Sequence, residues 1–348
     1  MNRRLTKQER LVLFALVEDG SRTNADVADR IGMRESTVSI HKRHLIRNGY
    51  VHFVNFPAFH RLGFQMMAEI FLQVNPVVPL NRLAKTYGEF FNTTPWVFDA
   101  YAATGFITAS GVFASVSDVI KLRDQYETFF QDSPGLKGRM RIWLFPFDIS
   151  RCRYAGNFAP GLHRMLDIEG LEPVTIPPER FEVKTAPVSQ AEATILVNLV
   201  ENPNATDAEV AHKMRRSRQS VNDARHSILE KGLYTRVAVP TLISRESGVS
   251  AAAYLKFRST ATFEKKVTVA GDEWWTQSSY FLERDSRLLA CYWFKDLKEC
   301  RSLMDKFISP FAEADLLTES PEIFLAPHGD TATLLDCSFA SILRTRGI

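Results

Sequence analysis

The sequence predicts an α+β protein in which a helical unit and an α/β sandwich each occur twice. Residues 9–57 align without a gap onto residues 192–240, at a constant offset of 183 positions. Roughly a quarter of the aligned positions are identical, and most matches are small or apolar, as a shared core requires. A second pattern, strand-helix-strand-strand-helix-strand, follows each aligned segment. Together these observations predict a tandem repeat of two domains.

The helical unit is a helix-turn-helix, and its first copy is clearest at residues 24–49. Apolar residues at helical spacing bury one face of the first short helix, and Gly32 breaks that helix. A second helix is expected over 35–47, where a glycine follows its last turn. A helix over 5–18 precedes the motif, and residues 50–56 alternate enough to be a strand. A strand in that place is the wing of a winged helix-turn-helix.

Each sandwich is predicted from strand-like segments and from helices with one apolar face. The expected elements of the first copy are strands 66–73, 97–103, 106–114 and 139–147 and helices 80–91 and 118–130. Those of the second copy are strands 250–257, 277–283, 287–294 and 316–325 and helices 263–269 and 296–308. This element order is that of a ferredoxin-like α+β sandwich.

These patterns divide the chain into six parts. They are a winged helix-turn-helix over 1–60, a ferredoxin-like sensor and pairing domain over 64–148, a linker over 149–187, a second winged helix-turn-helix over 188–244, a second ferredoxin-like domain over 248–326 and a C-terminal tail over 327–348. The linker is rich in proline and holds one short helix near 161–168. Apolar residues predict that the tail is a helix docked on the body: Leu334, Leu335, Phe339, Ile342 and Leu343.

Composition favours a globular protein without a membrane span. Apolar residues make up 45% and charged residues 24% of the 348 residues, which is ordinary. No apolar run reaches the roughly 18 residues of a transmembrane helix, and the charged N-terminus lacks a signal-peptide core. We therefore expect a cytoplasmic protein. The four cysteines have no cysteine or histidine at metal-ligand spacing, so we expect reduced thiols and no metal site.

Basic charge gathers at the first helix-turn-helix. Residues 1–50 contain ten Lys and Arg residues against six acids, whereas the whole chain has a net charge of +3. Such an excess attracts DNA phosphates, although a solvated helix face has the same composition. Residues 188–234 contain six bases and six acids. We therefore expect the second copy to bind DNA more weakly, or to be a structural copy.

The second helix of each helix-turn-helix is expected to enter the DNA major groove. Hydroxyls near its N-terminus reach phosphates or base edges, or else cap the helix, and long basic side chains anchor the backbone. The DNA-binding candidates of the first copy are Ser36, Thr37, Ser39, His41, Lys42, Arg43 and Arg47. Those of the second copy are Arg215, Arg216, Arg218, Gln219, Ser220, Asn222 and Arg225.

The segments 24–32 and 37–51 resemble the Lrp/AsnC, or feast/famine, transcriptional regulators. With the domain order, the resemblance covers both halves and indicates two copies fused in tandem. It implies ACT/RAM-type sandwiches and control of transcription by binding double-stranded DNA. In that family the sandwich pairs with a second copy and often binds an amino acid. The resemblance therefore implies a small-molecule effector at Thr104, Gly105 and Phe106, a pseudo-dimeric chain and, as one arrangement, a homo-oligomer of such chains.

An enzyme is the alternative, because sirohaem decarboxylases share this two-domain layout and can also be fused in tandem. In those enzymes, a pattern of histidine and tyrosine residues is expected around the second and third sandwich strands. Residues 97–114 and 277–294 contain no histidine, and the sequence has no nucleophile-base, paired-carboxylate or phosphate-loop motif. We therefore expect no enzymatic activity, no catalytic residues and no cofactor.

Overall fold

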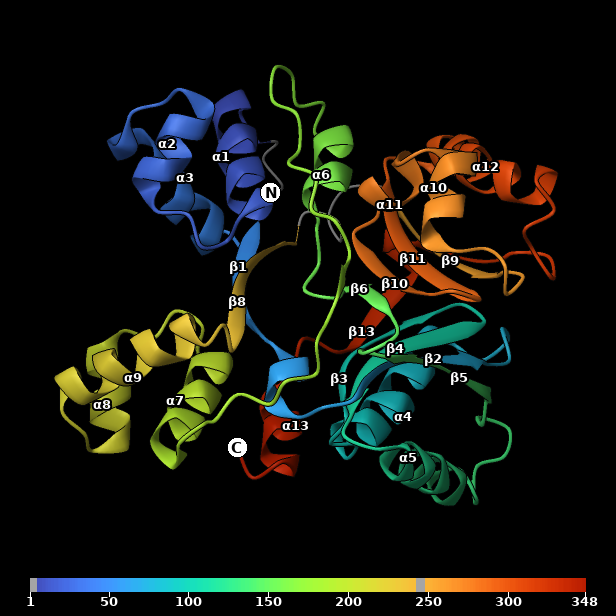
Figure 1. The fold of residues 1–348 in the computed structure, drawn as a ribbon, viewed down its shortest axis with the longest axis horizontal. Helices are drawn as coiled ribbons and strands as arrows, with labels where there is room; N and C mark the ends of the chain where they lie inside the picture. Colours follow the sequence, from blue (N-terminus) through green and yellow to red (C-terminus); the bar gives the residue numbers. More distant parts are fainter. Residues whose placement is uncertain (1–4, 242–247) are drawn as a thin grey trace. The chain divides into compact units, whose positions relative to one another are not determined.

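The computed structural model describes residues 5–241 and 248–348 of the chain, which divides into two compact units (Figure 1). Unit 1 comprises Met1–Val54, Ser150–Arg180 and Arg236–Gly329, and unit 2 comprises Asn55–Ile149, Phe181–Thr235 and Asp330–Ile348. Each unit contains one helical head and one sandwich. Each also contains a segment that comes, in the sequence, directly after the sandwich of the other unit. Two predicted parts lie outside the described residues: residues 1–4, with two of the basic residues, and 242–244, at the end of the second predicted helix-turn-helix.

The head of unit 1 has the three predicted helices. They are α1 (Lys7–Glu18), α2 (Asn24–Ile31) and α3 (Glu35–Arg47), followed by strand β1 (Val51–Pro57). Capping boxes begin α1 at Thr6 and α2 at Thr23, because each hydroxyl accepts a hydrogen bond from the amide three residues on while that residue's carboxylate bonds back. Gly32 ends α2 in the left-handed conformation, with φ 65°. Apolar side chains from all three helices form the core, among them Val12, Leu16, Val27, Val38 and Leu45.

The head of unit 2 repeats this order. Its elements are α7 (Gln190–Glu201), α8 (Asp207–Met214), α9 (Arg218–Glu230) and β8 (Tyr234–Pro240). Capping boxes again begin the first two helices, at Ser189 and Thr206. Val210, Val221 and Ile228 are buried at the places that Val27, Val38 and Leu45 take in the other head.

The sandwich of unit 2 has the ferredoxin-like order that the sequence predicts. Its elements are β2 (Met66–Gln73), α4 (Leu80–Asn92), β3 (Val97–Ala103), β4 (Phe106–Phe113), α5 (Val116–Phe129) and β5 (Arg139–Pro146). With a strand of the tail, β13 (Thr331–Leu335), the sheet order is β13-β3-β4-β2-β5, all antiparallel. Aromatic side chains of α4 and α5 join the sheet in one core, with Tyr87 and Tyr126 fully buried. The predicted α+β fold class is confirmed.

The sandwich of unit 1 follows the same order with one extra helix. Its elements are β9 (Val249–Lys256), α10 (Phe263–Ala270), α11 (Glu273–Thr276), β10 (Tyr280–Arg284), β11 (Arg287–Phe294), α12 (Leu297–Glu313) and β12 (Glu322–Pro327). The short helix α11 buries Trp274 and Trp275, and this explains why β10 begins later than the sequence predicts. Beneath the sheet, Lys266 and Glu283 form a fully buried ion pair with nitrogen and oxygen 2.5 Å apart.

Segments outside the repeat add strands to both sheets. In the linker, β6 (Arg151–Arg153) pairs with β10 and β7 (Glu179–Arg180) pairs with β6, so the sheet order is β12-β9-β11-β10-β6-β7. In the tail, β13 (Thr331–Leu335) pairs with β3, and a short helix, α13 (Ala340–Thr345), follows. The tail thus contains a strand as well as the helix expected from its apolar residues.

Helix α6 (Ala159–Met165) lies in the linker and joins the head of unit 1 to the sandwich of the same unit. Three apolar side chains from α6 and the residue after it belong to the core of the head: Ala159, Leu162 and Leu166. Toward the sandwich, Phe158 stacks on Trp293 of β11 with ring centroids 4.6 Å apart. Arg164 donates a hydrogen bond to the Trp293 carbonyl at 2.8 Å. The proline-rich linker is therefore partly a packed structural element.

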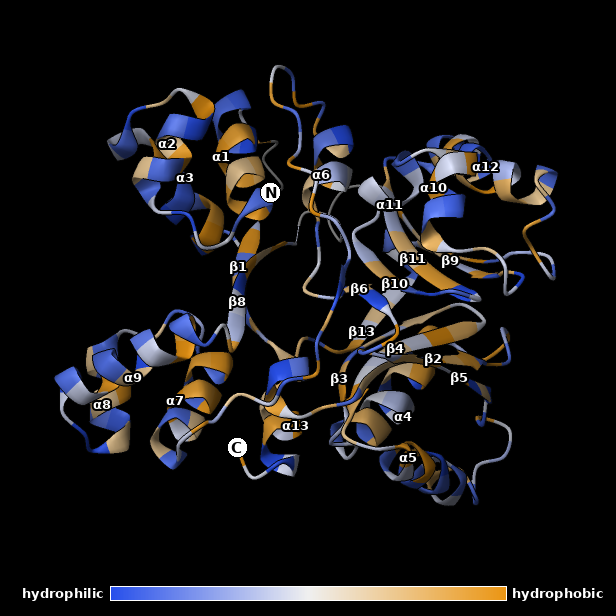
Figure 2. Ribbon diagram, viewed as in Figure 1, coloured by the Kyte–Doolittle hydropathy of each residue, from blue (hydrophilic) through white to orange (hydrophobic). Residues whose placement is uncertain are grey.

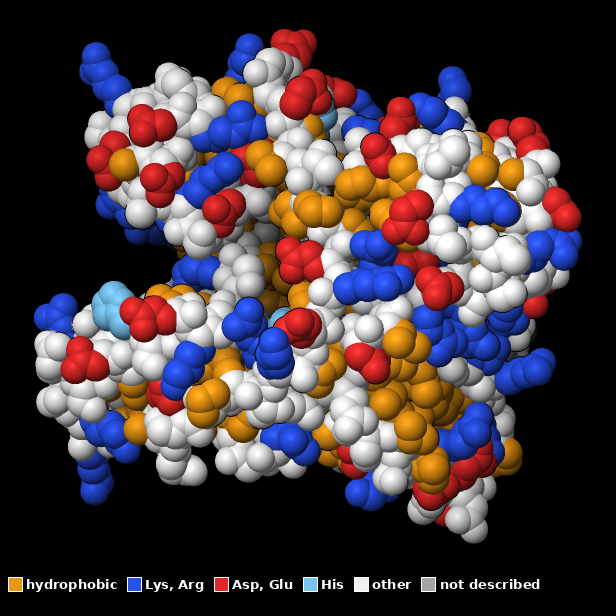
Figure 3. Space-filling view, viewed as in Figure 1, with side chains coloured by type: hydrophobic (Ala, Val, Ile, Leu, Met, Phe, Trp, Pro, Cys, Tyr) orange, Lys and Arg blue, Asp and Glu red, His pale blue; other side chains and the backbone are white. Residues whose placement is uncertain are grey.

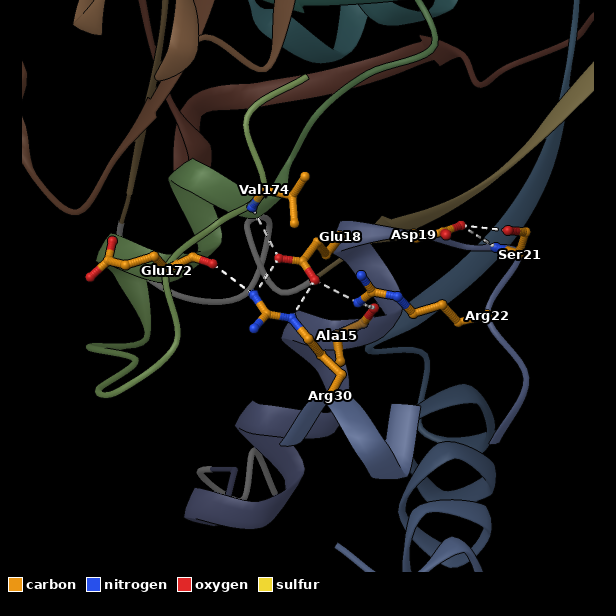
Figure 4. A network of polar contacts seen from close by, with 8 residues as sticks. All are labelled: Ala15, Glu18, Asp19, Ser21, Arg22, Arg30, Glu172 and Val174. Carbon is orange, nitrogen blue, oxygen red and sulfur yellow. Dashed lines mark hydrogen bonds and ion pairs between the residues drawn. The ribbon is translucent and has the colours of Figure 1, made fainter. Parts of the chain in front are cut away.

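Glu18 connects the first head to the linker through polar contacts (Figure 4). Its carboxylate accepts hydrogen bonds from Arg22 at 2.5 Å, from Arg30 at 2.9 Å and from the Val174 amide at 3.1 Å. Arg30 also donates to the Glu172 carbonyl at 2.7 Å. Burial raises the pKa of Glu18, but these hydrogen bonds outweigh it and hold the pKa below its ordinary value. The carboxylate therefore stabilises the docking of the linker on the head.

Hydropathy follows this arrangement. In Figure 2 the helices of both heads carry hydrophobic and hydrophilic residues in close succession, as expected for helices with one face in a core. No described helix has both the length and the apolar character needed to cross a membrane. All four cysteines are free thiols, two buried and two half-buried.

Replacing Glu18 by Gln should lower the free energy of unfolding by about 2 kcal/mol at neutral pH, because two arginines lose their charged partner. The folded-state pKa is lowered, so this contribution is present above the ordinary carboxyl pKa and is lost as the pH falls through the lowered value. Urea denaturation at neutral and acidic pH measures the effect, and hydrogen exchange at Val174 locates it. The control is Glu169→Gln, at an exposed position of the same linker. An equal loss of unfolding free energy in both variants would contradict the role of Glu18 in docking the linker.

Candidate nucleic-acid interface

Helix α3 presents one continuous exposed row of side chains. Val38 and Leu45 point into the head core. On another side of the helix, four residues that are four, three and four positions apart lie in one row along the helix axis. This α3 row consists of Ser36, Ile40, Arg43 and Arg47, all of which are exposed. It contains three of the predicted DNA-binding residues and one residue, Ile40, that the prediction missed although the helical spacing from Ser36 could have found it.

The N-terminus of α3 leaves its hydroxyl side chains available. The N-cap residue is Arg34, and no side chain caps the helix. Ser36 and Thr37 therefore do not take the capping role that was the alternative to DNA contact. Hydroxyl groups and free amides at a helix N-terminus attract anions, since the helix dipole is positive there. These donors favour a phosphate at this end of α3, whereas the exposed carboxylate of Glu35 in the same turn opposes one.

Two other predicted residues of α3, His41 and Lys42, contact side chains of the same head. His41 lies 3.2 Å from the Gln8 side chain, and Ser39 accepts a hydrogen bond from Arg43 through its carbonyl at 3.3 Å. Lys42 lies over the Phe53 ring, with its nitrogen 5.5 Å from the centroid. Burial, and then the neighbouring Arg236, lower the pKa of Lys42. Lys42 is thus partly engaged within the head, whereas Arg43 and Arg47 extend from it.

In the second head, acidic residues engage the polar groups of α9. Asp207 forms an ion pair with Arg225 at 2.8 Å and accepts a hydrogen bond from Asn222 at 3.0 Å. Asp223 accepts a hydrogen bond from Gln219 at 2.7 Å. The amide of Ser220 donates to the N-cap Ser217, which begins α9. Three further candidates remain exposed at and before the start of the helix: Arg215, Arg216 and Arg218.

The rows of the two heads differ in charge. At the constant offset of 183 positions, the α3 row corresponds to an exposed α9 row of Gln219, Asp223, His226 and Glu230. The α3 row carries two arginines and no acid, whereas the α9 row carries two acids and no Lys or Arg. On the face drawn in Figure 3, both heads carry Lys and Arg interspersed with Asp and Glu. The heads therefore differ in the charge of the rows of α3 and α9 as well as in their overall balance of bases and acids.

The predicted effector residues form a turn and its flank. Thr104 and Gly105 connect β3 to β4, and Gly105 has a φ of 86°, which favours glycine. The Gly105 carbonyl accepts a hydrogen bond from the Val74 amide at 3.0 Å. Phe106 stacks on Phe71 with centroids 5.9 Å apart. The contacts of Gly105 and Phe106 hold the hairpin on β2, and binding of an effector there stays a prediction.

A group with metal-ligand character lies in unit 2, where the sequence predicted none. Among the described residues, Asp99, Asp336 and Cys337 bring their ligand atoms within 4.8 Å of one another. Burial, and then the nearby Asp336, raise the pKa of Asp99 to about 7. Two carboxylates and a thiol are donor types that a divalent transition metal accepts. The sequence could not indicate this group, because it forms only when β13 pairs with β3.

Comparisons with known proteins agree with this geometry. Residues 5–52 match a family of winged helix-turn-helix DNA-binding domains, so the first head is such a domain. A search of the curated proteins finds no match.

Two solved structures cover nearly the whole chain. The siroheme decarboxylase NirDL matches with a TM-score of 0.52 at 14% identity, over 98% of this chain and 97% of that chain. Its co-complex with an iron-uroporphyrin III analogue gives a TM-score of 0.53 at 15% identity, with the same coverage. The structure of AsnC from E. coli covers 41% of this chain and 92% of its own, at 12% identity and a TM-score of 0.31, which is too low to support an inference. Similarity at these identities establishes the fold alone.

The expectation that the chain is not an enzyme is contradicted by this full-length similarity. That expectation rested on the missing histidines of two strand segments. The arrangement of domains over 98% of the chain, however, is that of a decarboxylase, and it does not depend on those positions. The fold of this chain therefore also occurs in an enzyme, and its first head is a winged helix-turn-helix DNA-binding domain.

Replacing Asp99 by Asn should stabilise the protein at alkaline pH by about 4 kcal/mol, because its pKa is raised by about three units. Because the folded-state pKa of Asp99 is raised to about 7, its ionisation lowers stability progressively between about pH 4 and about pH 7. The variant removes this loss, so the two proteins should differ more at about pH 8 than at about pH 4.5. Denaturant titrations at several pH values measure it, with the exposed Asp124→Asn as control. A pH-independent difference would show that folding does not raise the pKa of Asp99.

Proposed function

We propose that this chain is a DNA-binding transcription regulator whose first head reads a specific sequence. The single observation that carries the proposal is the α3 row, which combines a hydroxyl, an apolar side chain and two arginines on one exposed helix face. Arginine bonds to guanine edges or to phosphates, and hydroxyls bond to either. The match of residues 5–52 to winged helix-turn-helix DNA-binding domains supports the same role.

The second head contributes less to binding in this proposal. Asp223 and Glu230 of the α9 row repel phosphates, and Asp207 engages the amide and guanidinium groups that would otherwise read bases. We infer that the two heads contact DNA unequally, so the preferred site is asymmetric rather than palindromic. In this view, Arg215, Arg216 and Arg218 supply phosphate contacts without specificity.

The tandem origin and an effector belong to the same proposal. Two Lrp/AsnC-like halves on one chain would act as a pseudo-dimer, with an effector at the β3–β4 turn changing the preferred arrangement of the heads. Helix α6 supports a coupling route within unit 1, because it packs on the first head through Leu162 and on β11 through Phe158. A shift in the sandwich of unit 1 would reach the head through this helix, whereas the β3–β4 turn belongs to the sandwich of unit 2 and lies outside this route.

The double variant Arg43→Ala, Arg47→Ala should lose at least tenfold in affinity for duplex DNA, because it removes both cations of the α3 row. Electrophoretic mobility shift with the region upstream of the protein's own gene, at several salt concentrations, measures the loss. The dependence of log affinity on log salt should fall by about one to two, since each phosphate contact adds about 0.9 to that slope.

The matched control is His226→Ala, Glu230→Ala, at the corresponding positions of the second head. This variant should bind as tightly as the wild type, or more tightly, since it removes an acid. Equal losses in both double variants, or no loss on removing the two arginines, would refute the assignment of α3 as the reading helix.

A second candidate function is the decarboxylation of an iron tetrapyrrole. The observation that favours it is the similarity to the siroheme decarboxylase NirDL over 98% of the chain. This activity would reside in the sandwiches, so it is compatible with a DNA-binding head. The relevant chemistry is loss of CO₂ from a carboxylate side chain of the macrocycle.

Iron-uroporphyrin III is the probe for this second candidate. Binding should shift the Soret absorption of the iron porphyrin at micromolar protein, and incubation with a carboxylate-bearing iron tetrapyrrole should give products lighter by whole CO₂ units in mass spectrometry. Metal-free uroporphyrin III is the matched control. An unchanged Soret band with no change in mass would exclude this function and would leave the DNA-binding proposal intact.

A further inference from the structure

Ile40 is an exposed apolar side chain in the α3 row. Its side chain is 58% exposed, although it is large, apolar and β-branched. It takes no part in the apolar cluster that forms the core of the head. A β-branched residue also lowers helix propensity slightly, so Ile40 brings the isolated helix no stability. The head therefore exposes this apolar group at a small cost in free energy.

The neighbours of Ile40 are polar rather than apolar. Ser36 lies one turn before it and Arg43 one turn after it, and both are exposed. Such surroundings do not form the contiguous apolar patch that a protein partner would cover. An isolated apolar side chain between a hydroxyl and a guanidinium instead complements a partner whose surface is mostly polar and carries single methyl groups.

The major groove of DNA is such a surface. Each base pair exposes hydrogen-bond donors and acceptors there, and the 5-methyl group of thymine is the apolar feature. A helix that lies in the groove with Arg43 and Arg47 on phosphates or guanines brings the middle of its exposed row to the base edges. Ile40 occupies that middle position. In the second head the corresponding residue is Asp223, which accepts a hydrogen bond from Gln219 and has no methyl group to offer.

We propose that Ile40 is a specificity-determining residue that packs on the 5-methyl group of a thymine in the bound site. This inference rests on the proposed function, namely that α3 of the first head reads duplex DNA. It adds the chemical identity of one recognised base. Contact between the two apolar groups removes both from water, which is worth a several-fold change in affinity.

The test begins with the wild-type full chain and a random duplex DNA pool, from which the bound site is selected and sequenced. Each thymine of that site is then replaced singly by deoxyuridine, which lacks only the methyl group. Affinities are measured for the wild type, for Ile40→Ala and for the control Ile46→Ala, which removes another exposed isoleucine of the same helix. Circular dichroism checks that the variants are folded.

One thymine-to-uracil change should weaken wild-type binding about three- to tenfold, and the same change should have less than about a twofold effect on Ile40→Ala. The control variant Ile46→Ala should keep the wild-type response. If the chain selects a site but Ile40→Ala responds to every uracil as the wild type does, the inference is wrong and the proposed function stands. If the wild type selects no sequence and binds no duplex, the proposed function fails with it.

Discussion

The open edge of each sandwich sheet is the constraint on which the rest of the structure depends. A ferredoxin-like sheet leaves its second strand at an edge, here β3 and β10, whose backbone N–H and C=O groups need partners. In unit 2, β13 pairs with β3, and in unit 1, β6 pairs with β10. Both covering strands come from the chain that follows the other sandwich. Neither sheet is completed by its own half, so the two halves depend on each other for backbone hydrogen bonds.

This pairing of each sheet edge with a strand from the other half also determines which sandwich the first head is attached to. Once the linker has covered β10, helix α6 is held against β11, and its apolar face becomes part of the head core of unit 1. Glu18 then joins two arginines of the head to the backbone at Val174. A carboxylate that is 1% exposed must have such partners, because an unpaired buried charge costs several kcal/mol. The first head is therefore fixed to the sandwich of the other half by both packing and charge.

Local signals in the sequence predict most of the elements, but they do not predict that each sheet edge pairs with a strand from the other half. Helix α3 has the bounds expected from its apolar spacing, because Val38 and Leu45 are determined by local helix geometry. Strand β6 was missed, since three residues without a turn signal become a strand only when β10 offers its edge. The candidate site divides in the same way. The spacing of the α3 row can be read from the sequence, whereas the engagement of Lys42 by Phe53 depends on a strand that folds back.

The two heads show how a shared core permits opposite surfaces. Positions that build the core stay apolar, as in the pairs Val38 and Val221 or Leu45 and Ile228, because a polar or much smaller side chain there would disturb three packed helices. Exposed positions carry no such cost, so Arg47 of one head can correspond to Glu230 of the other without loss of fold. Charge on an exposed helix row acts mainly on what approaches it, since water screens it from the protein's own core. Divergence at such exposed positions therefore changes which head attracts a polyanion while both heads stay folded.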